Sequence, residues 1–362
     1  MILPRFHPLP TESWPDGYVP QATMCRPDCQ VLQDSAGLWL EPLCGQTIAV
    51  IGFGNQGRAH ALNLRDSGIR VVGGGRRGSL ARAAARDLGF PDLDAVEAVR
   101  DASLAALCVP DQVAGEVWSI VEPAMRPDSV AGFVCGAPLR FGLVHAPPTR
   151  GIVMVAPKGP GTTLRMRYTM GQGIPALMAV HAGGSDPART RALGLAWAAG
   201  IGCGRAGVIE STAAIEAETD LFGEQAVLCG GMVHLMQAAY DTLIDAGYPA
   251  EVAYIECIHE LKQVADLVYE QGIAGMRERI STTAAFGIDE AGPVIVDDAT
   301  RDALRTLLAR VQDGSFFARL MADQRTGGSQ LRDGRTRARA QPLEAAGRTV
   351  RGMMPWLGKE TP

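Results

Sequence analysis

The stretch TIAVIGFGNQGRAHALNLRDSG (residues 47–68) decides the fold of the first half of this 362-residue chain. It begins with an apolar β-type run, passes through Gly52-x-Gly54-x-x-Gly57 and continues into an Ala/Leu-rich segment with helical spacing. The first glycine permits a tight turn, the second lets the backbone approach a pyrophosphate, and the third lets a helix pack on a strand. The flanking strand and helix predict a dinucleotide-binding unit; the alternative is a plain glycine-rich turn.

The segment after the next strand indicates which dinucleotide binds. After IRVVGGG (69–75), an NAD-binding fold usually presents an acid to the ribose 2′-hydroxyl, but this chain has Arg76, Arg77, Gly78 and Ser79. Guanidinium and hydroxyl groups suit a 2′-phosphate. The sequence therefore predicts NADPH; the alternative is that the two arginines are exposed loop residues.

Strand-like and helix-like runs alternate after the glycine motif. Strand-like runs begin residues 103–118 and 151–165 and make up residues 129–136. This alternation predicts an α/β fold with a doubly wound parallel sheet. The run from residue 151 ends in PKGPG (157–161), which places Lys158 where open α/β sheets bind ligands. A surface-turn lysine fits the spacing equally well.

Composition limits the domain count and the class of protein. The length favours two domains, 47% of the residues are hydrophobic, and the net charge of −5 gives no overall attraction for nucleic acid. Only Cys25 and Cys29 lie close together among 8 cysteines, without the second pair of a zinc site. No membrane span or export signal is evident, so a soluble, cytoplasmic protein is expected.

Changes in periodicity predict the domain limits. Residues 1–28 are rich in proline and polar residues and are predicted to form an N-terminal extension. Residues 29–209 are predicted to form the dinucleotide-binding domain. From residue 210 the strand pattern gives way to helical patterns, so residues 210–357 are predicted to form a helical domain.

Two carboxylates precede a strongly apolar helix. In ETDLFGEQ (218–225), Asp220 and Glu224 come directly before AVLCGGMVHLMQAAY (226–240), which is apolar on nearly every side and is predicted to be buried. Acids at the start of a buried helix must be paired, hydrogen-bonded or bound to a cation. Capping of the helix and compensation of its dipole are the alternative for Asp220.

A second acidic pair lies in EVAYIECIHELKQVADLVYE (251–270). Glu256 and Glu260 are spaced one turn apart beside an apolar stripe, although like charges at this spacing repel in an isolated helix. Two such pairs are similar to the carboxylate clusters with which helical bundles bind metals. Hard oxygen ligands favour Mg²⁺ over zinc. Solvated glutamates remain an equal alternative.

Seven motifs together resemble one family. GFGNQGRAHALNLRDSG, GGRRGS, VMVAPKGPGTTLR, ETDLFGEQAVLCGG, GYPAEVAYIECIHELK, GIAGMRERISTTA and GRTVRGMMPWL occur in the order and approximate spacing of ketol-acid reductoisomerase, over about residues 40–357. The length is similar to the short form of that family. The resemblance implies a Rossmann-type domain that binds NADPH, then a knotted all-helical domain through which two subunits interlock as a homodimer with shared active sites; a higher oligomer is the alternative.

The resemblance also implies an activity in branched-chain amino-acid biosynthesis. Two Mg²⁺ ions are expected to hold a 2-hydroxy-3-keto acid such as 2-acetolactate, to promote its alkyl migration and to assist reduction by NADPH. The implied metal ligands are Asp220, which bridges both ions, Glu224, and, from the partner subunit, Glu256 and Glu260. Lys158 and Glu260 are implied to be catalytic, and Ser281 and Glu260 to bind substrate. The implied cofactor contacts are Gly52, Phe53, Gly54, Asn55, Gln56, Gly57, Arg76, Ser79, Asp111, Gln112, Val113, Ala114 and Gly161.

The chain departs from the family near the implied catalytic centre. The usual His-Gly-Phe-Asn-Ile-His-Phe-Gly is here CGAPLRFG (135–142), so Cys135 occupies the catalytic histidine position and Arg140 that of a second histidine. A thiol cannot supply the neutral donor and acceptor pair of an imidazole. The remaining departures are Arg58, Ala81, Thr282 and residues 285–287. Two alternatives therefore stand beside the ordinary activity: a specialised enzyme acting on another 2-keto acid in secondary metabolism, and a non-catalytic NADPH-binding scaffold.

Overall fold

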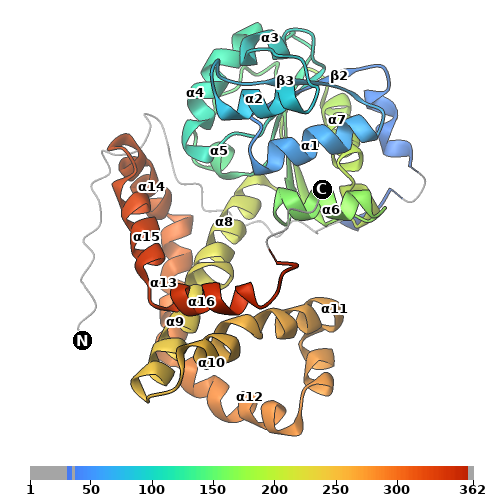
Figure 1. Ribbon diagram of the computed structural model, residues 1–362. Coiled ribbons are helices and arrows are strands. Elements are labelled where there is room, and N and C mark those ends of the chain that lie inside the picture. The colour runs from blue at the N-terminus through green and yellow to red at the C-terminus, as the bar shows by residue number, and fades with distance from the viewer. Residues whose placement is uncertain (1–30, 35–36, 358–362) are drawn as a thin grey trace. The chain divides into compact units, whose positions relative to one another are not determined.

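The computed structural model of the chain describes residues 31–34 and 37–357. The extension predicted for residues 1–28, with Cys25 and Cys29, lies outside the described residues. The chain forms two compact units, which meet in sequence between Asp220 and Leu221 (Figure 1). The limits 29–209 and 210–357 stay predictions.

The first unit contains an eight-stranded sheet with the order β1-β8-β7-β6-β5-β4-β2-β3. The strands are β1 (Val31–Leu32), β2 (Thr47–Ile51), β3 (Arg70–Gly74), β4 (Leu104–Leu107), β5 (Val130–Phe133), β6 (Gly151–Pro157), β7 (Ala176–Gly183) and β8 (Val208–Glu210). Strands β2 to β6 are parallel, whereas β7 runs antiparallel to β6 and β1 runs antiparallel to β8. The predicted doubly wound parallel sheet is confirmed.

The strand order reverses at β2, which is where sheets of this kind bind their ligands. From β2 the chain crosses to β3 on one side and then to β4 on the other, with Ile48 opposite both Val71 and Leu104. The carboxyl end of β2 is therefore the point at which the strand order reverses, where sheets of this kind open a crevice for their ligands. The glycine-rich turn begins there, directly after Ile51.

Helices cover both faces of this sheet (Figure 1). They are α1 (Asn55–Asp66), α2 (Leu80–Asp87), α3 (Ala95–Val99), α4 (Asp111–Val121), α5 (Ala137–Arg140), α6 (Gly161–Thr169) and α7 (Pro187–Gly200), with short 3₁₀ turns η2 (Leu38–Leu43), η3 (Glu122–Ala124) and η4 (Cys203–Arg205). The helix α8 (Ala213–Gly223) follows β8 and contains the boundary between the two units. One core lies between the sheet and α1, α2, α6 and α7, and the other between the sheet and α3, α4 and α5. Alternate residues of β2 enter opposite cores, because successive strand side chains point to opposite faces.

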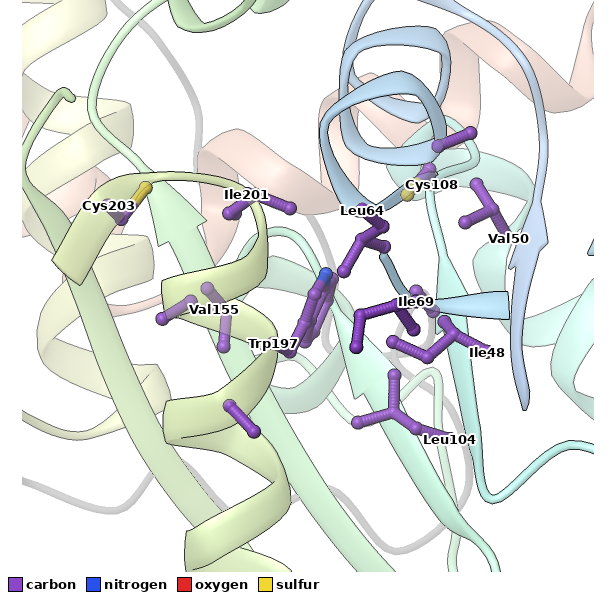
Figure 2. Packing of buried hydrophobic residues seen from close by; sticks show 14 of the residues in the cluster. Ile48, Val50, Leu64, Ile69, Leu104, Cys108, Val155, Trp197, Ile201 and Cys203 are labelled. Atoms are coloured by element: carbon purple, nitrogen blue, oxygen red, sulfur yellow. The ribbon is translucent and has the colours of Figure 1, made fainter. Parts of the chain in front are cut away.

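Trp197 of α7 is the largest fully buried side chain in the first of these cores. It lies among Leu64, Ile69 and Ile201 (Figure 2). Its ring packs where Gly132 of β5 lacks a side chain, since a Cβ there would come within 2.5 Å of the indole. Its Nε1–H donates to Nδ1 of the buried His60, at 3.2 Å.

The second unit is helical throughout its described residues, as predicted. It contains the π-helical turns η5 (Glu224–Leu228) and η6 (Ile255–His259) and the helices α9 (Gly230–Asp245), α10 (Ala250–Tyr254), α11 (Leu261–Arg279), α12 (Thr282–Ile295), α13 (Asp298–Gln312), α14 (Ser315–Arg325), α15 (Ser329–Ala340) and α16 (Leu343–Gly352). Gly272 interrupts α11 with a φ of 70°. No helix in the described part of the chain is both long and apolar enough to span a membrane.

The prediction that α9 is buried is wrong for a single chain. Tyr240 is its one buried residue, whereas Leu235 is 54% exposed. The core cluster found in this unit is small and consists of Tyr240, Ala253, Tyr254, Ala346 and Val350, while Met276, Val311, Phe317 and Ala318 are buried outside it. The apolar character of α9 therefore exceeds what its own chain buries.

His60 makes the stability of the first unit dependent on pH. Burial lowers the pKa of His60 to about 3, from 6.5. Between these values the unfolded chain binds a proton that the folded chain does not, so stability is lost as the pH falls below 6.5. At about pH 5 this loss is about 2 kcal/mol for a single such group.

We expect His60→Gln to reduce this acid sensitivity, because glutamine does not titrate while its carbonyl can still accept from Trp197. Thermal unfolding of the native and variant proteins from pH 8 to pH 4.5 measures the difference. Parallel pH profiles for the two proteins would contradict the assignment to His60.

Candidate functional site

The glycine-rich turn combines two glycines fixed by packing with one that faces open space. A Cβ on Gly52, whose φ is 92°, would lie 2.7 Å from the carbonyl oxygen of Cys108, and one on Gly57 would lie 1.8 Å from that of Gly52. A Cβ on Gly54 would meet nothing within 4 Å, although Gly54 is the N-cap of α1. This space at the N-terminus of α1 fits the pyrophosphate of a dinucleotide.

The loop after β6 packs directly on this turn. The side-chain amide of Gln56 donates to the carbonyl oxygen of Gly159 at 2.9 Å, and the N–H of Gly161 donates to Oδ1 of Asn55. A Cβ on Gly161 would lie 2.1 Å from the carbonyl oxygen of Asn55. The two loops that the sequence singled out are therefore joined side by side.

The other predicted cofactor residues differ in exposure. Phe53 is 6% exposed and its ring meets Phe90 edge to face, so its side chain belongs to the core. Ala114 is also buried. Arg76 is exposed after β3, and Ser79 caps α2 by accepting the N–H of Arg82 at 3.2 Å. Of the remaining predicted contacts, Gln112 and Val113 lie in the first turn of α4 and are half-buried.

Lys158 lies between two carboxylates of α8. Its Nζ donates to Oε1 of Glu216 at 2.6 Å and to Oδ1 of Asp220 at 2.9 Å. Burial lowers the pKa of Lys158, but the two carboxylates outweigh burial, so its pKa is raised above the usual value. Lys158 is therefore a partly exposed, paired ammonium group in the turn at the carboxyl end of β6.

Glu216 is a site residue that the sequence analysis missed. Its side chain is 2% exposed, and its Oε2 accepts the N–H of Gly136 at 2.6 Å. Burial raises the pKa of Glu216, although Lys158 opposes this effect. The available signal was the spacing of Glu216, Asp220 and Glu224 at every fourth residue, which is the repeat of one helix face.

Asp220 does not cap a helix. The helix α8 begins at Ala213, so Asp220 lies in its last turns, and an acid there does not complement the dipole. The capping alternative is therefore wrong. Ion pairing with Lys158 accounts for its position.

Cys135 faces an acid at the start of α4. Its Sγ lies 2.8 Å from Oδ1 of Asp111, to which the thiol donates. Burial raises the pKa of Cys135 well above its usual value, and the negative charges of Asp111 and Glu216 raise it further. Burial also raises the pKa of Asp111. Cys135 therefore stays a protonated hydrogen-bond donor, which is not the chemistry of a histidine base.

Arg140 comes with an acidic partner of its own. Its Nε donates to Oε1 of Glu218 at 2.8 Å, and the two side chains are 7% and 13% exposed. Glu218 lies on α8 between Glu216 and Asp220. The arginine that replaces a histidine thus joins α5 to the helix that carries the site carboxylates.

The remaining predicted site residues belong to the second unit. Glu224 begins η5, and Glu256 and Glu260 lie at η6, so the segment predicted as a continuous α-helix contains a π-turn instead. Ser281 is exposed and caps α12 by accepting the N–H of Ala284 at 3.1 Å. The described residues of a single chain bring no three acidic, histidine or cysteine side chains together as a metal site.

The fold and these contacts define a class. A doubly wound sheet, an open glycine turn at the switch point and a paired lysine held against that turn are features of an oxidoreductase that uses a nicotinamide cofactor.

Comparisons with known proteins narrow this class to a family. The acetohydroxy acid isomeroreductase NADPH-binding domain matches residues 42–207, and the ketol-acid reductoisomerase C-terminal domain matches residues 214–356. The structure of an NADH-preferring ketol-acid reductoisomerase from an uncultured archaean is similar at 34% identity with a TM-score of 0.85, covering 90% of this chain and 99% of that one. The chain belongs to the ketol-acid reductoisomerase family.

A second solved structure has a similar fold over about three quarters of this chain. A semialdehyde dehydrogenase NAD-binding protein from Cupriavidus necator, solved with calcium and NAD, is 20% identical with a TM-score of 0.58, covering 74% of this chain and 98% of that one. At this identity the similarity concerns the fold alone.

We expect Arg140→Met to destabilise the protein by about 3 kcal/mol, because it leaves Glu218 charged in a nearly buried position. The double variant Arg140→Met/Glu218→Leu should recover most of this loss, since it removes both charges. Urea unfolding of the native protein, the two single variants and the double variant measures the coupling. Additive effects of the two substitutions would show that the pair is not coupled.

Proposed function

We propose that this protein is a ketol-acid reductoisomerase that acts on a 2-hydroxy-3-keto acid such as 2-acetolactate, with NADPH and two Mg²⁺ ions. The observation that carries the proposal is the group formed by Lys158, Glu216 and Asp220. It lies against the nucleotide turn through the bonds of Gln56 and Asn55 to the loop that follows Lys158.

The available ligand atoms fit Mg²⁺. Asp220 keeps 39% of its side chain exposed, and Glu224, Glu256 and Glu260 are exposed carboxylates. Carboxylate oxygens are the ligands that Mg²⁺ prefers. Bound Mg²⁺ would polarise the carbonyl and hydroxyl oxygens of the substrate and stabilise developing negative charge on them.

The side chains proposed to act on the substrate have different roles. The buried carboxylate of Glu216 holds Lys158 protonated and oriented, so Lys158 can donate a proton to a substrate oxygen. Gly136 fixes Glu216 from its other oxygen. Ser281, with an exposed hydroxyl at the N-terminus of α12, suits a substrate carboxylate.

A homodimer is part of the proposal, and the exposed apolar surface of the second unit supports it. Val227, Leu228 and Leu235 are each more than half exposed, as are Ile273 and Phe286. Apolar exposure on this scale is typical of a surface that binds another chain. Interlocking of two second units would cover it and would supply Glu256 and Glu260 from the partner subunit, through the knotted arrangement and shared sites that the family resemblance implies.

A cytoplasmic location is part of the proposal. The six cysteines in the described part of the chain are all free thiols, which suits a reducing compartment.

A second function is favoured by one observation. Cys135 donates to Asp111 where the family usually has a histidine, so the proton chemistry at this position is altered. The second candidate is therefore an enzyme that uses the same cofactors on a different 2-keto acid.

The cofactor preference depends on Arg76. We expect Arg76→Ala to raise the KM for NADPH by about tenfold and to leave the KM for NADH unchanged, because a charge-assisted hydrogen bond to the 2′-phosphate is lost. Arg70→Ala, an exposed arginine at the other end of β3, is the matched control. A native enzyme that prefers NADH, as the archaean relative does, would overturn this part of the proposal.

Substrate turnover separates the candidate functions. We expect the purified protein to oxidise NADPH with 2-acetolactate only when Mg²⁺ is present, and Cys135→His to raise that rate by restoring an imidazole. The same assay with simple 2-keto acids is the comparison. Turnover of a 2-keto acid alone would favour the second candidate, and NADPH binding without any turnover would favour a scaffold.

A further inference from the structure

Two helical turns of the second unit have an unusual backbone. The turns η5 and η6 are five-residue π-helical segments, and they are the only ones in the part of the chain that the structure describes. In η5 the N–H of Cys229 donates to the carbonyl oxygen of Glu224 at 2.9 Å, and in η6 that of Glu260 donates to the carbonyl oxygen of Ile255 at 3.0 Å. Both bonds span five residues instead of four.

Such turns are rare because they hold one residue more than an α-helical turn, and they occur frequently at functional sites. No residue of η5 or η6 is fully buried, although Ile255 and Ile258 of η6 pack against the small core of this unit. What they share is their position: Glu224 begins the first, and Glu256 and Glu260 lie in and directly after the second.

The sequence after η5 allows that turn to form. A Cβ on Gly230 would lie 2.2 Å from the carbonyl oxygen of Gln225, and one on Gly231 would lie 2.0 Å from that of Ala226. Any other residue at these positions would force the carbonyl groups of η5 to move. The backbone of η5, the turn that begins with Glu224, therefore explains why glycines occupy positions 230 and 231.

The extra residue in η6 changes the relation between its two acids. In an α-helix the N–H of Glu260 would pair with the carbonyl of Glu256, and the two side chains would lie one above the other. Here that N–H pairs with the carbonyl of Ile255, so the angle between Glu256 and Glu260 around the helix axis differs from that of an α-helix. The two carboxylates are therefore presented in a relative direction that an α-helical turn would not give them.

We propose that the π-turns η5 and η6 are the elements that position Glu224, Glu256 and Glu260 for Mg²⁺. This inference rests on the proposed function, because it assigns a role to residues that would bind the metal. The glutamates supply the ligand atoms, and the extra residue in each turn sets the direction in which they are presented.

Two variants shorten or disturb the turns while keeping every carboxylate. Deletion of Cys257 converts η6 into an α-helical turn with the flanking helices in register. Gly230→Ala places a methyl group where the carbonyl of Gln225 lies in η5. The matched controls are Cys257→Ala, which keeps the length of the turn, and Gly334→Ala, whose Cβ would approach no atom closer than 3.9 Å.

The measurements are Mg²⁺ binding by calorimetry, Mn²⁺ binding by electron paramagnetic resonance, NADPH binding by fluorescence, and helix content by circular dichroism, all on the full-length chain. We expect both test variants to bind Mg²⁺ and Mn²⁺ about tenfold more weakly or worse. Helix content and NADPH affinity should not change, and the controls should behave like the native protein.

Native metal affinity in folded protein lacking Cys257, or in Gly230→Ala, would overturn the inference while leaving the proposed function intact. Loss of helix content on deletion of Cys257 would also contradict it, since a π-turn is expected to tolerate removal of its extra residue. A native protein that binds no Mg²⁺ would overturn the proposed function itself, and this inference with it.

Discussion

The ion pair between Lys158 and Glu216 is the constraint on which the site depends. A carboxylate that is 2% exposed is costly unless its charge is compensated, and removing one member of such a pair is strongly destabilising. Here the compensation comes from the lysine at the end of β6 and from the N–H of Gly136, ahead of α5. The buried carboxylate of Glu216 thereby connects the first turns of α8 to the ends of the neighbouring strands β5 and β6. One turn further along α8, Asp220 also contacts Lys158.

The residues that depart from the family come with local partners. Cys135 has Asp111 as its acceptor, and Arg140 has Glu218. Each pair joins the segment 135–142 to a different neighbour, α4 in the first case and α8 in the second. The altered segment is therefore a consistent set of contacts. Because the side chains of Cys135 and Arg140 both have hydrogen-bond partners, the altered segment would affect catalysis through the proton donors that it presents to the reacting groups.

The sequence predicted the parts of the structure that follow from short-range patterns. The Gly52 to Gly57 turn, the strands around it and the position of Lys158 at a strand end all have signatures within a few residues, and the structure contains them. The burial of Glu216 could not be predicted in the same way, because it depends on Gly136 and Lys158, which are distant in sequence. The π-turns were missed because the spacing of Glu256 and Glu260 fits an α-helix equally well. The exposure of α9 was missed because periodicity reports that a surface is apolar and does not report which chain covers it.

The contacts of Asn55 and Gln56 have a consequence for altering the cofactor. Their side chains are hydrogen-bonded to the loop that follows Lys158, so the glycine-rich turn and the loop that carries the lysine are held together. Substitutions in that turn would disturb the chemistry along with nucleotide binding. Arg76 and Arg77, by contrast, are exposed beyond the end of β3. On the proposed assignment of the 2′-phosphate to Arg76, the preference for one nicotinamide over the other can drift, in evolution or by design, at a small and separable patch while the contacts of Lys158 stay unchanged.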